Sequence, residues 1–112
     1  MEEQESPIVE REFPVVTLCG STKFKNEFEK AMKDLTLLGN VVISVGCFGH
    51  QDPDPLLWEK KNSGMLDRMH RQKIDMADWI FVVNPGGYIG ESTRKEIDYA
   101  ISQGKSVEFM DH

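Results

Sequence analysis

Hydrophobic residues along this chain follow two alternating patterns: short continuous runs, and longer segments in which they recur every three or four residues. The short runs predict strands over residues 15–18, 41–45, 80–83 and 106–110. The longer segments predict amphipathic helices over residues 22–38, 56–77 and 93–103. The predicted order of elements is therefore β-α-β-loop-α-β-α-β.

Individual positions refine this pattern. The run over residues 41–45 is apolar almost throughout, which predicts a strand buried on both faces of a parallel sheet. Gly39 marks the end of the first helix, and Asn62-Ser63-Gly64 predicts a break or kink in the second. Residues 46–55 hold two glycines and two prolines, a composition typical of an irregular loop.

Strands that alternate with helices predict an α/β fold. We expect a small doubly wound parallel sheet of four to five strands, flavodoxin- or Rossmann-like, with right-handed crossovers and helices on both faces. Residues 13–112 form a single domain in this interpretation, and the acidic, polar residues 1–12 form a flexible N-terminal arm.

Two glycine-containing turns follow predicted strands. The run Asn84 to Glu96 holds three glycines, Gly86, Gly87 and Gly90, which let backbone N–H groups approach a ligand closely. Ser92 or Thr93 is a candidate helix cap there, and Glu96 is expected in the first helical turn. The second turn is Cys19-Gly20-Ser21-Thr22-Lys23. Because ligands of parallel sheets bind beyond the carboxyl ends of the strands, both turns and the loop Gly46 to His50 predict one shared site.

Charge and composition narrow the function. With 13 Lys and Arg against 19 Asp and Glu, the net charge of −6 argues against a broad electrostatic interaction with nucleic acid or an anionic membrane. A small anion held by local N–H groups is compatible with it. The N-terminus lacks a signal-peptide pattern and no apolar run reaches membrane-spanning length, so we expect a cytoplasmic protein.

Cysteine and histidine usage predicts neither a disulfide nor a metal site. Cys19 and Cys47 are too few for a disulfide framework and are expected to be reduced. His50, His70 and His112 lie far apart in the sequence, without metal-ligand spacing. We therefore expect no protein-bound metal and no cofactor, although magnesium could accompany a phosphate.

Several stretches resemble the nucleoside 2-deoxyribosyltransferase-like superfamily, which includes deoxyribosyltransferases and nucleoside 5′-monophosphate N-glycosidases. They are Leu18–Thr22, Ala77–Val83, Ser92–Ala100 and Gly104-Lys105. The resemblance covers about residues 15–109 and is greatest to small members with a GGYIGxSTRxEI turn. It implies that residues 13–112 are a nucleotide-binding domain whose ligand is a small-molecule nucleotide.

The resemblance also implies a nucleophile. In the family a glutamate at the position of Glu96 attacks the anomeric carbon of the sugar and forms a glycosyl-enzyme ester. A carboxylate in the first turn of a helix is expected to be held ionised by the helix dipole, as attack on an oxocarbenium-like centre requires. The alternative is a first-turn acid that only stabilises its helix.

Small and hydroxyl residues of the two turns are implied to hold a 5′-phosphate. The candidates are Gly20, Ser21, Thr22, Lys23, Gly87, Gly90, Ser92 and Thr93. Transferases of free nucleosides tend to carry an acid for the 5′-hydroxyl, whereas this chain has Gly90 and Ser92 six and four positions before Glu96. This favours hydrolysis of a (deoxy)nucleoside 5′-monophosphate, although Glu91 would repel a phosphate unless it points away. The alternative for Ser21, Ser92 and Thr93 is plain helix capping.

The second predicted helix supplies candidate acids. The family often has an aspartate near His70, and this chain departs from that pattern. His70 could protonate the departing base because its ordinary pKa lies near neutrality, with Asp67 as a second candidate. Gly46 and Phe48, with His50, could line the base pocket. The alternatives are a solvated basic helix face around His70 and a core position for Phe48.

Other functions stay open at this point. They are a nucleoside deoxyribosyltransferase, a non-catalytic nucleotide-binding or sensor module, and an enzyme that cleaves a dinucleotide in a wider pocket. An enzyme requires Glu96 to face an open pocket beside a second titratable group, whereas pairing with Arg94 or Lys95 indicates a surface role.

Apolar residues beyond the needs of one small domain predict a homodimer. They are Trp58, Met65, Met69 and Trp79. For Met65, Met69 and Met76 the alternative is simple core packing.

Overall fold

The computed structural model describes residues 11–48 and 54–112. In chain order, its strands are β1 (Val15–Gly20), β2 (Val41–Ile43), β3 (Trp79–Val83) and β4 (Ser106–Phe109). The α-helices are α1 (Lys25–Leu37), α2 (Lys60–Asp75) and α3 (Glu91–Ser102). Short 3₁₀ helices η1 (Pro55–Trp58) and η2 (Pro85–Gly87) precede α2 and α3.

The four strands form one parallel sheet in the order β2-β1-β3-β4. Val16 of β1 is in register with Val42 on one side and with Trp79 on the other. The strand order reverses between β1 and β3, as in doubly wound sheets. The predicted α/β class, parallel sheet and helices on both faces are thereby confirmed.

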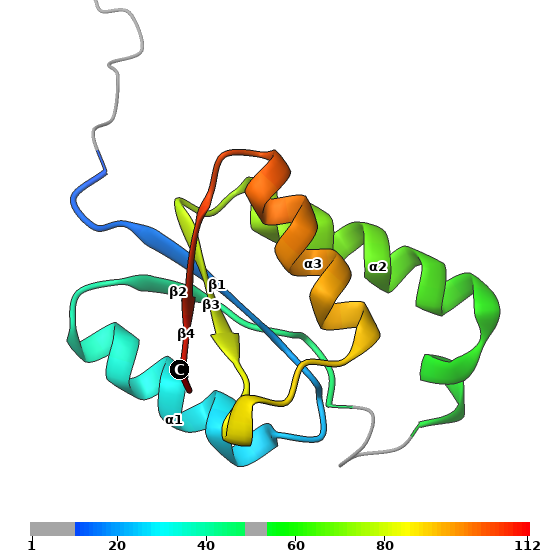
Figure 1. The fold of residues 1–112 in the computed structure, drawn as a ribbon. Helices are drawn as coiled ribbons and strands as arrows, with labels where there is room; N and C mark the ends of the chain where they lie inside the picture. Colours follow the sequence, from blue (N-terminus) through cyan, green and yellow to red (C-terminus); the bar gives the residue numbers. More distant parts are fainter. Residues whose placement is uncertain (1–10, 49–53) are drawn as a thin grey trace, which may run out of the picture.

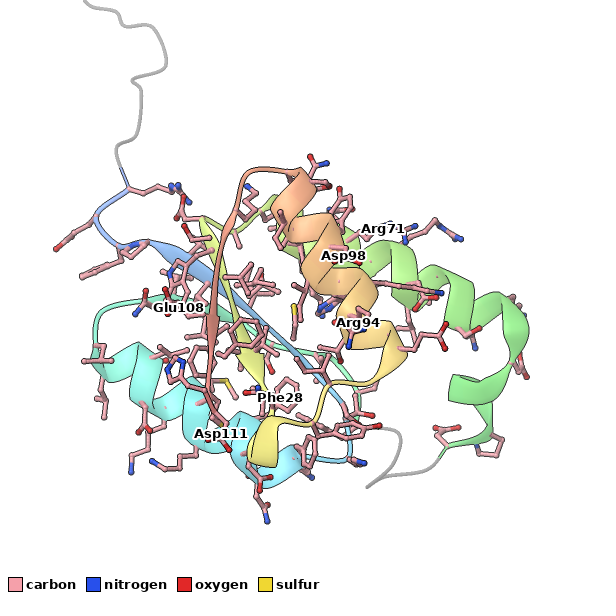
Figure 2. The ribbon with its side chains drawn as sticks, in the orientation of Figure 1. Phe28, Arg71, Arg94, Asp98, Glu108 and Asp111 are labelled. Atoms are coloured by element: carbon pink, nitrogen blue, oxygen red, sulfur yellow. The ribbon has the colours of Figure 1, made fainter. Side chains whose placement is uncertain are left out.

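Helices cover both faces of the sheet, α1 on one and α2 with α3 on the other (Figure 1). Side chains of β1 alternate between the two layers, as the strand period of two requires. Val16 and Leu18 pack with Phe28 of α1, which points toward the sheet (Figure 2). Cys19 packs with Ile74 of α2 and Ala100 of α3 on the other face.

The second strand differs from its prediction. β2 covers only Val41–Ile43, lies at the edge of the sheet and leaves Val41 49% exposed, so it is not buried on both faces. Ser44 and Val45 leave the ladder, and the Ser44 carbonyl accepts a hydrogen bond from Lys73 Nζ at 2.9 Å. A strand at the edge of a sheet pairs with one neighbouring strand only. The apolar run did not indicate whether this strand lies at the edge or in the centre of the sheet.

Helix ends differ from the predictions as well. α1 begins at Lys25 instead of residue 22, and α3 begins at Glu91 instead of Thr93. α2 runs without interruption through residues 62–64, and the expected break lies earlier, at the extended residue Glu59. The N–H groups of Asn62 and Ser63 both donate to the Glu59 carbonyl, so these residues start the helix instead of breaking it.

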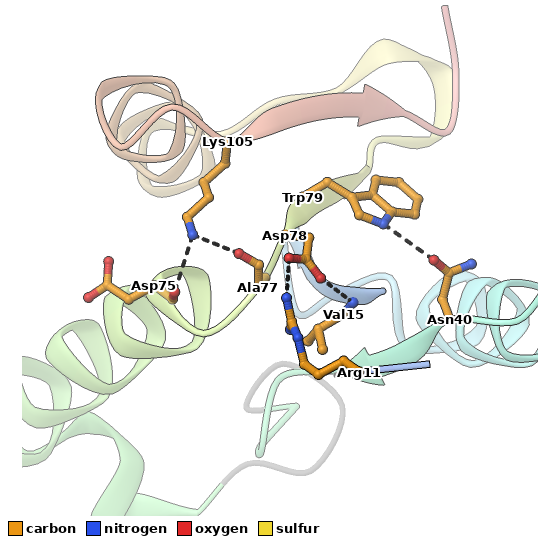
Figure 3. A network of polar contacts seen from close by, with 8 residues as sticks. All are labelled: Arg11, Val15, Asn40, Asp75, Ala77, Asp78, Trp79 and Lys105. Atoms are coloured by element: carbon orange, nitrogen blue, oxygen red, sulfur yellow. Dashed lines mark hydrogen bonds and ion pairs between the residues drawn. The ribbon is translucent and has the colours of Figure 1, made fainter. Parts of the chain in front are cut away.

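A polar network fixes the amino-terminal edge of the sheet (Figure 3). Asp78 accepts hydrogen bonds from Val15 N at 2.7 Å and from Arg11 Nη2 at 2.6 Å, and these bonds lower the pKa of its carboxyl group. Lys105 donates to the carbonyls of Asp75 and Ala77 at the end of α2 (Figure 3). The carboxyl ends of the strands lie at the opposite end of the sheet, where a ligand site is expected.

Of the expected N-terminal arm, residues 1–10 lie outside the described part of the chain. Arg11, near the end of that arm, is tied to the domain through Asp78. Among the described residues, no helix combines the length and the apolar character needed to cross a membrane.

Candidate functional site

A cavity of about 660 Å³ opens at the carboxyl ends of β1 and β2, beside the reversal of strand order. Its volume is within the range of small-ligand pockets, about 300–1,000 Å³. Its walls come from the turn after β1, the segment after β2, the inner face of α2 and the start of α3. The lining residues are Gly20, Ser21, Thr22, Lys23, Val45, Gly46, Cys47, Leu66, Asp67, Met69, His70, Lys73, Tyr88, Gly90, Glu91, Ser92, Thr93 and Glu96.

Most of the predicted site residues meet in this cavity, but two do not. Phe48 packs on the core, with its ring 5.5 Å from that of Phe28 and inclined by 74°, so it takes the core position weighed as its alternative. Gly87 lies in the exposed turn η2, outside the cavity lining. His50 falls outside the described residues. The base pocket predicted around Phe48 is therefore not formed by that side chain.

Glu96 lies in the second turn of α3, because the helix begins five residues earlier at Glu91. Its Oε1 is buried, has no hydrogen-bond partner among the described residues and lies 3.6 Å from His70 Nε2. Burial and the negative charge of Asp67 together raise the pKa of Glu96 to about 7, and an interaction with the Cys19 thiol opposes the rise. The expectation that a first-turn position holds this carboxylate ionised is therefore corrected.

His70 projects from α2 into the same place. Its Nε2 lies 3.4 Å from Cys19 Sγ, and only 12% of its side chain is exposed. Burial, together with the positive charge of Lys73, lowers the pKa of His70 to about 4, and the negative charge of Asp67 opposes the change. A neutral ring at pH 7 does not supply the proton that the sequence led us to assign to it. Its Nε2 lies 3.6 Å from Glu96 Oε1, just beyond hydrogen-bond distance.

The sequence did not single out Cys19 as a site residue. It ends the buried part of β1, and burial raises the pKa of its thiol well above the ordinary value, with Glu96 adding to the rise. Cys19, His70 and Glu96 come from β1, α2 and α3, and their donor atoms all lie within 4.8 Å of one another. Spacing along the sequence gave no signal for this cluster, because only the fold brings these residues together.

The turn after β1 depends on Gly20. Its φ is +151°, and a Cβ atom built there would lie 2.6 Å from the Val83 carbonyl oxygen. This glycine therefore allows β1 to pack closely against the end of β3. Ser21 Oγ accepts from Lys23 N at 3.4 Å, and the N-cap of α1 is Phe24, without a side-chain cap. The capping role considered for Ser21 is not observed.

The start of α3 is likewise uncapped by a side chain. Its N-cap is Gly90, Ser92 is exposed, and Thr93 is buried inside the first turn. The predicted capping by Ser92 or Thr93 is wrong, because both residues follow the helix start. The first backbone N–H groups of α3 therefore have no acceptor within the helix, and the residues that carry them line the cavity.

The turn between β3 and α3 is held by the C-terminal segment. Asp111 Oδ2 accepts from Gly86 N at 2.7 Å. Asn84 exchanges two side-chain hydrogen bonds with the Asp111 backbone, at 2.9 and 3.0 Å. Asn84 follows β3 and Asp111 follows β4, and these two strands are neighbours in the sheet. The sequence analysis did not use this position of the two polar residues.

Tyr88 is a second residue that the sequence interpretation missed. It lines the cavity, and its ring lies 3.8 Å from Lys23 Nζ and 5.8 Å from the Phe24 ring centroid. It thereby connects the turn after β1 to the turn before α3.

A smaller cavity of about 280 Å³ lies between α2 and α3. It shares Asp67, Glu91, Ser92 and Glu96 with the first cavity. Glu91 Oε2 lies 3.9 Å from Lys95 Nζ, and both side chains are exposed. Lys95 therefore pairs with Glu91 and not with Glu96.

No protein-family model matches this sequence, and no curated protein matches it. The structure shows a small α/β fold with a four-stranded parallel sheet. The function is therefore to be inferred from the site.

Proposed function

We propose that this protein is an N-glycosidase that hydrolyses the N-glycosidic bond of a (deoxy)nucleoside 5′-monophosphate, with Glu96 as the nucleophile. One observation carries the proposal: Glu96 lines the large cavity and keeps a buried carboxylate oxygen without a hydrogen-bond partner among the described residues. Burying a polar atom without a partner costs free energy, and such an atom calls for a specific explanation. The resemblance of residues 86–97 to the deoxyribosyltransferase-like superfamily supports the same role.

The reaction takes two steps. The Glu96 carboxylate attacks C1′ as the bond between C1′ and the base nitrogen breaks, and the bonding electron pair leaves with the base, which takes up a proton. Water then attacks C1′ of the glycosyl ester and gives up a proton to the solvent. This step releases the sugar 5-phosphate and returns the Glu96 carboxylate.

The base needs a proton donor, and the surroundings of His70 make its ring neutral at pH 7. In this proposal His70 is a positioning residue whose Nε2, 3.6 Å from Glu96 Oε1, orients the nucleophile. Asp67, which lines both cavities beside Glu96, is the carboxylate assigned to relay a proton from solvent water to the departing base.

The two turns favour a phosphate-bearing substrate. Both the stretch Gly20–Lys23 and the stretch Gly90–Thr93 line the cavity, and the latter contains the first N–H groups of α3. A helix N-terminus favours an anion. Neither Gly90 nor Ser92 carries a carboxylate that could accept a hydrogen bond from a free 5′-hydroxyl group. The charge of Glu91 is offset by Lys95.

The surroundings of Glu96 support an enzyme over a non-catalytic sensor module. Glu96 lies beside a second titratable group, His70, in an open cavity. Within the described part of the chain, the ion pair of Lys95 is with Glu91. A deoxyribosyltransferase would use the same nucleophile and differ in its acceptor, a second base in place of water.

The test is base release followed by liquid chromatography. The purified protein is incubated with each deoxynucleoside and ribonucleoside 5′-monophosphate, and with free nucleosides with and without a second base. Glu96→Gln and Glu96→Ala are assayed in parallel. Asp98→Asn is the matched control, because Asp98 is exposed on the same helix and lines neither of the two cavities (Figure 2).

We expect release of free base from a 5′-monophosphate, lost in both Glu96 variants by at least about 1,000-fold, as for removal of a nucleophile, and retained in Asp98→Asn. Release only from free nucleosides in the presence of a second base would replace this proposal with a transferase. No release, combined with a rise in melting temperature on nucleotide addition, would indicate the binding module.

A further inference from the structure

Three donor atoms of different chemistry converge on one point at the floor of the cavity. They are Cys19 Sγ, His70 Nε2 and a carboxylate oxygen of Glu96, all within 4.8 Å of one another. Cys19 is buried, and the side chains of His70 and Glu96 are 12% and 21% exposed. The three come from one strand and two helices, so the fold itself positions them.

The geometry differs from that of a cysteine-histidine-carboxylate relay. In a relay the nucleophile and the carboxylate bind different ring nitrogens of the histidine. Here both Cys19 Sγ and Glu96 Oε1 approach the same atom, His70 Nε2, at 3.4 and 3.6 Å. Atoms that converge in this way can share a central cation.

Two of the three donor-to-donor distances fit a tetrahedral ion, and the third is at most 4.8 Å. With bonds of about 2.3 Å to sulfur and about 2.0 Å to nitrogen and oxygen, Zn²⁺ holds its donor atoms about 3.5 Å apart. The sulfur-to-nitrogen and nitrogen-to-oxygen distances of 3.4 and 3.6 Å agree with this spacing. The buried Glu96 Oε1, which has no hydrogen-bond partner among the described residues, would be satisfied by coordination to the ion.

We infer that Cys19, His70 and Glu96 form a site for a divalent transition-metal ion of the zinc class, with the fourth position open to the cavity. A thiolate, an imidazole and a carboxylate suit Zn²⁺ or Co²⁺ and do not suit Mg²⁺ or Ca²⁺, which take oxygen ligands. The Cys19 thiol releases its proton as the ion binds.

The site has a consequence that rests on the proposed function. Glu96 cannot both ligate a metal ion and attack C1′, so an ion at this site blocks the nucleophile. The metal ion therefore acts as a reversible inhibitor of base release.

Cobalt is the probe for the site itself. The full-length protein is treated with a chelator, exchanged into metal-free buffer and titrated with Co²⁺. A tetrahedral site with a thiolate ligand produces strong visible d–d bands and a sulfur-to-metal charge-transfer band in the near ultraviolet. We expect both, saturating at one Co²⁺ per chain and displaced by Zn²⁺.

Four variants assign the ligands. Cys19→Ala should lose the charge-transfer band, and His70→Ala and Glu96→Gln should each weaken Co²⁺ binding by more than the roughly 10- to 100-fold that loss of an outer-shell partner costs. Cys47→Ser is the control and should keep the bands, because Cys47 is exposed at the cavity rim and outside the cluster. Circular dichroism verifies that each variant is folded. Absence of the bands in the wild type, or their persistence in folded Cys19→Ala, would overturn the inference.

Base release in the presence of Zn²⁺ then tests the inhibitory role. We expect inhibition at the concentration that displaces Co²⁺, reversed by EDTA. Co²⁺ bands in a protein that releases no base even without metal would retain the metal site and remove the glycosidase. Base release without Co²⁺ bands would retain the glycosidase and remove the metal site.

Discussion

At the scale of single residues, the burial of Glu96 and the charge of Asp67 decide the protonation of the proposed nucleophile. Glu96 is buried, and the nearby Asp67 carboxylate adds electrostatic repulsion, so its pKa rises to about 7. A carboxyl group with that pKa is about half ionised at neutral pH. Its availability as a nucleophile is therefore controlled by the surroundings and increases as the pH rises through 7.

Asp67→Asn should lower the pKa of Glu96, because removing a neighbouring negative charge favours the ionised form. Burial remains, so the pKa should stay above the ordinary value for Glu. Carbon-13 NMR of the labelled side-chain carboxyl group, recorded as a pH titration in metal-free buffer, measures the shift directly. Asp98→Asn is the control, and an equal shift in that variant would contradict a local effect of Asp67.

Ser92→Asp tests the phosphate assignment at the mouth of the cavity. A carboxylate there would repel a 5′-phosphate, so kcat/KM for the preferred 5′-monophosphate should fall by about 10- to 100-fold, the equivalent of about 1–3 kcal/mol. Ser92→Asn has nearly the same shape without the charge and should change kcat/KM by much less. Equal losses in both variants would mean that shape and not charge matters at this position.

At the scale of elements, the site depends on how closely the ends of strands pack. β1 and β3 approach each other at Gly20, and the turn after β3 is tied to the C-terminal segment by Asn84 and Asp111. These contacts place the turn after β1 and the start of α3 on either side of the cavity. The position of Glu96 thus follows from strand packing as well as from its own helix.

Gly20→Ala should destabilise the protein by about 2–4 kcal/mol, because it combines an unfavourable φ with a Cβ atom 2.6 Å from the Val83 carbonyl oxygen. Gly104→Ala is the matched control: its φ is +76°, but no atom outside its chain neighbours lies within 4 Å of the added Cβ. That variant should lose only about 1–2 kcal/mol. Urea denaturation gives both free energies of unfolding, and equal losses would show that the clash with β3 is relieved at little cost.

At the scale of the whole molecule, α2 carries exposed apolar side chains on the helix that borders the cavity. Met65 and Met69 are 41% and 44% exposed, and Met76 just after the helix is 56% exposed. These three methionines are exposed, so the alternative that they only pack in the core is wrong. Trp79 is half-buried against Phe81, and the side chain of Trp58 lies outside the described ones. The expected homodimer stays a prediction, with α2 as its contact surface.

Met65→Glu should shift the protein toward monomer, since a charge at the centre of an apolar contact is unfavourable. Size-exclusion chromatography with light scattering, over a range of protein concentrations, gives the mass. Leu37→Glu is the control, because Leu37 is more exposed, at 76%, but lies on α1 across the sheet. A monomeric mass for the wild type at all concentrations would refute the homodimer.

Much of the architecture was determined by the sequence itself. Short apolar runs and helical spacing are local signals, so they were sufficient for the α/β class and for the approximate positions of the strands and helices. Because ligands bind at the carboxyl ends of parallel strands, the sequence also predicted that the turns at Gly20 and Gly90 lie at one site with Glu96.

Only the tertiary structure decided the properties that depend on neighbours distant in sequence. The edge position of β2 depends on which strands pair, and the core position of Phe48 depends on α1. The pKa values of His70 and Glu96 depend on burial, and the cluster with Cys19 requires one strand and two helices to meet. Sequence patterns report the local period of the chain, whereas burial, shifted pKa values and the convergence of side chains arise from contacts that form only in the folded molecule.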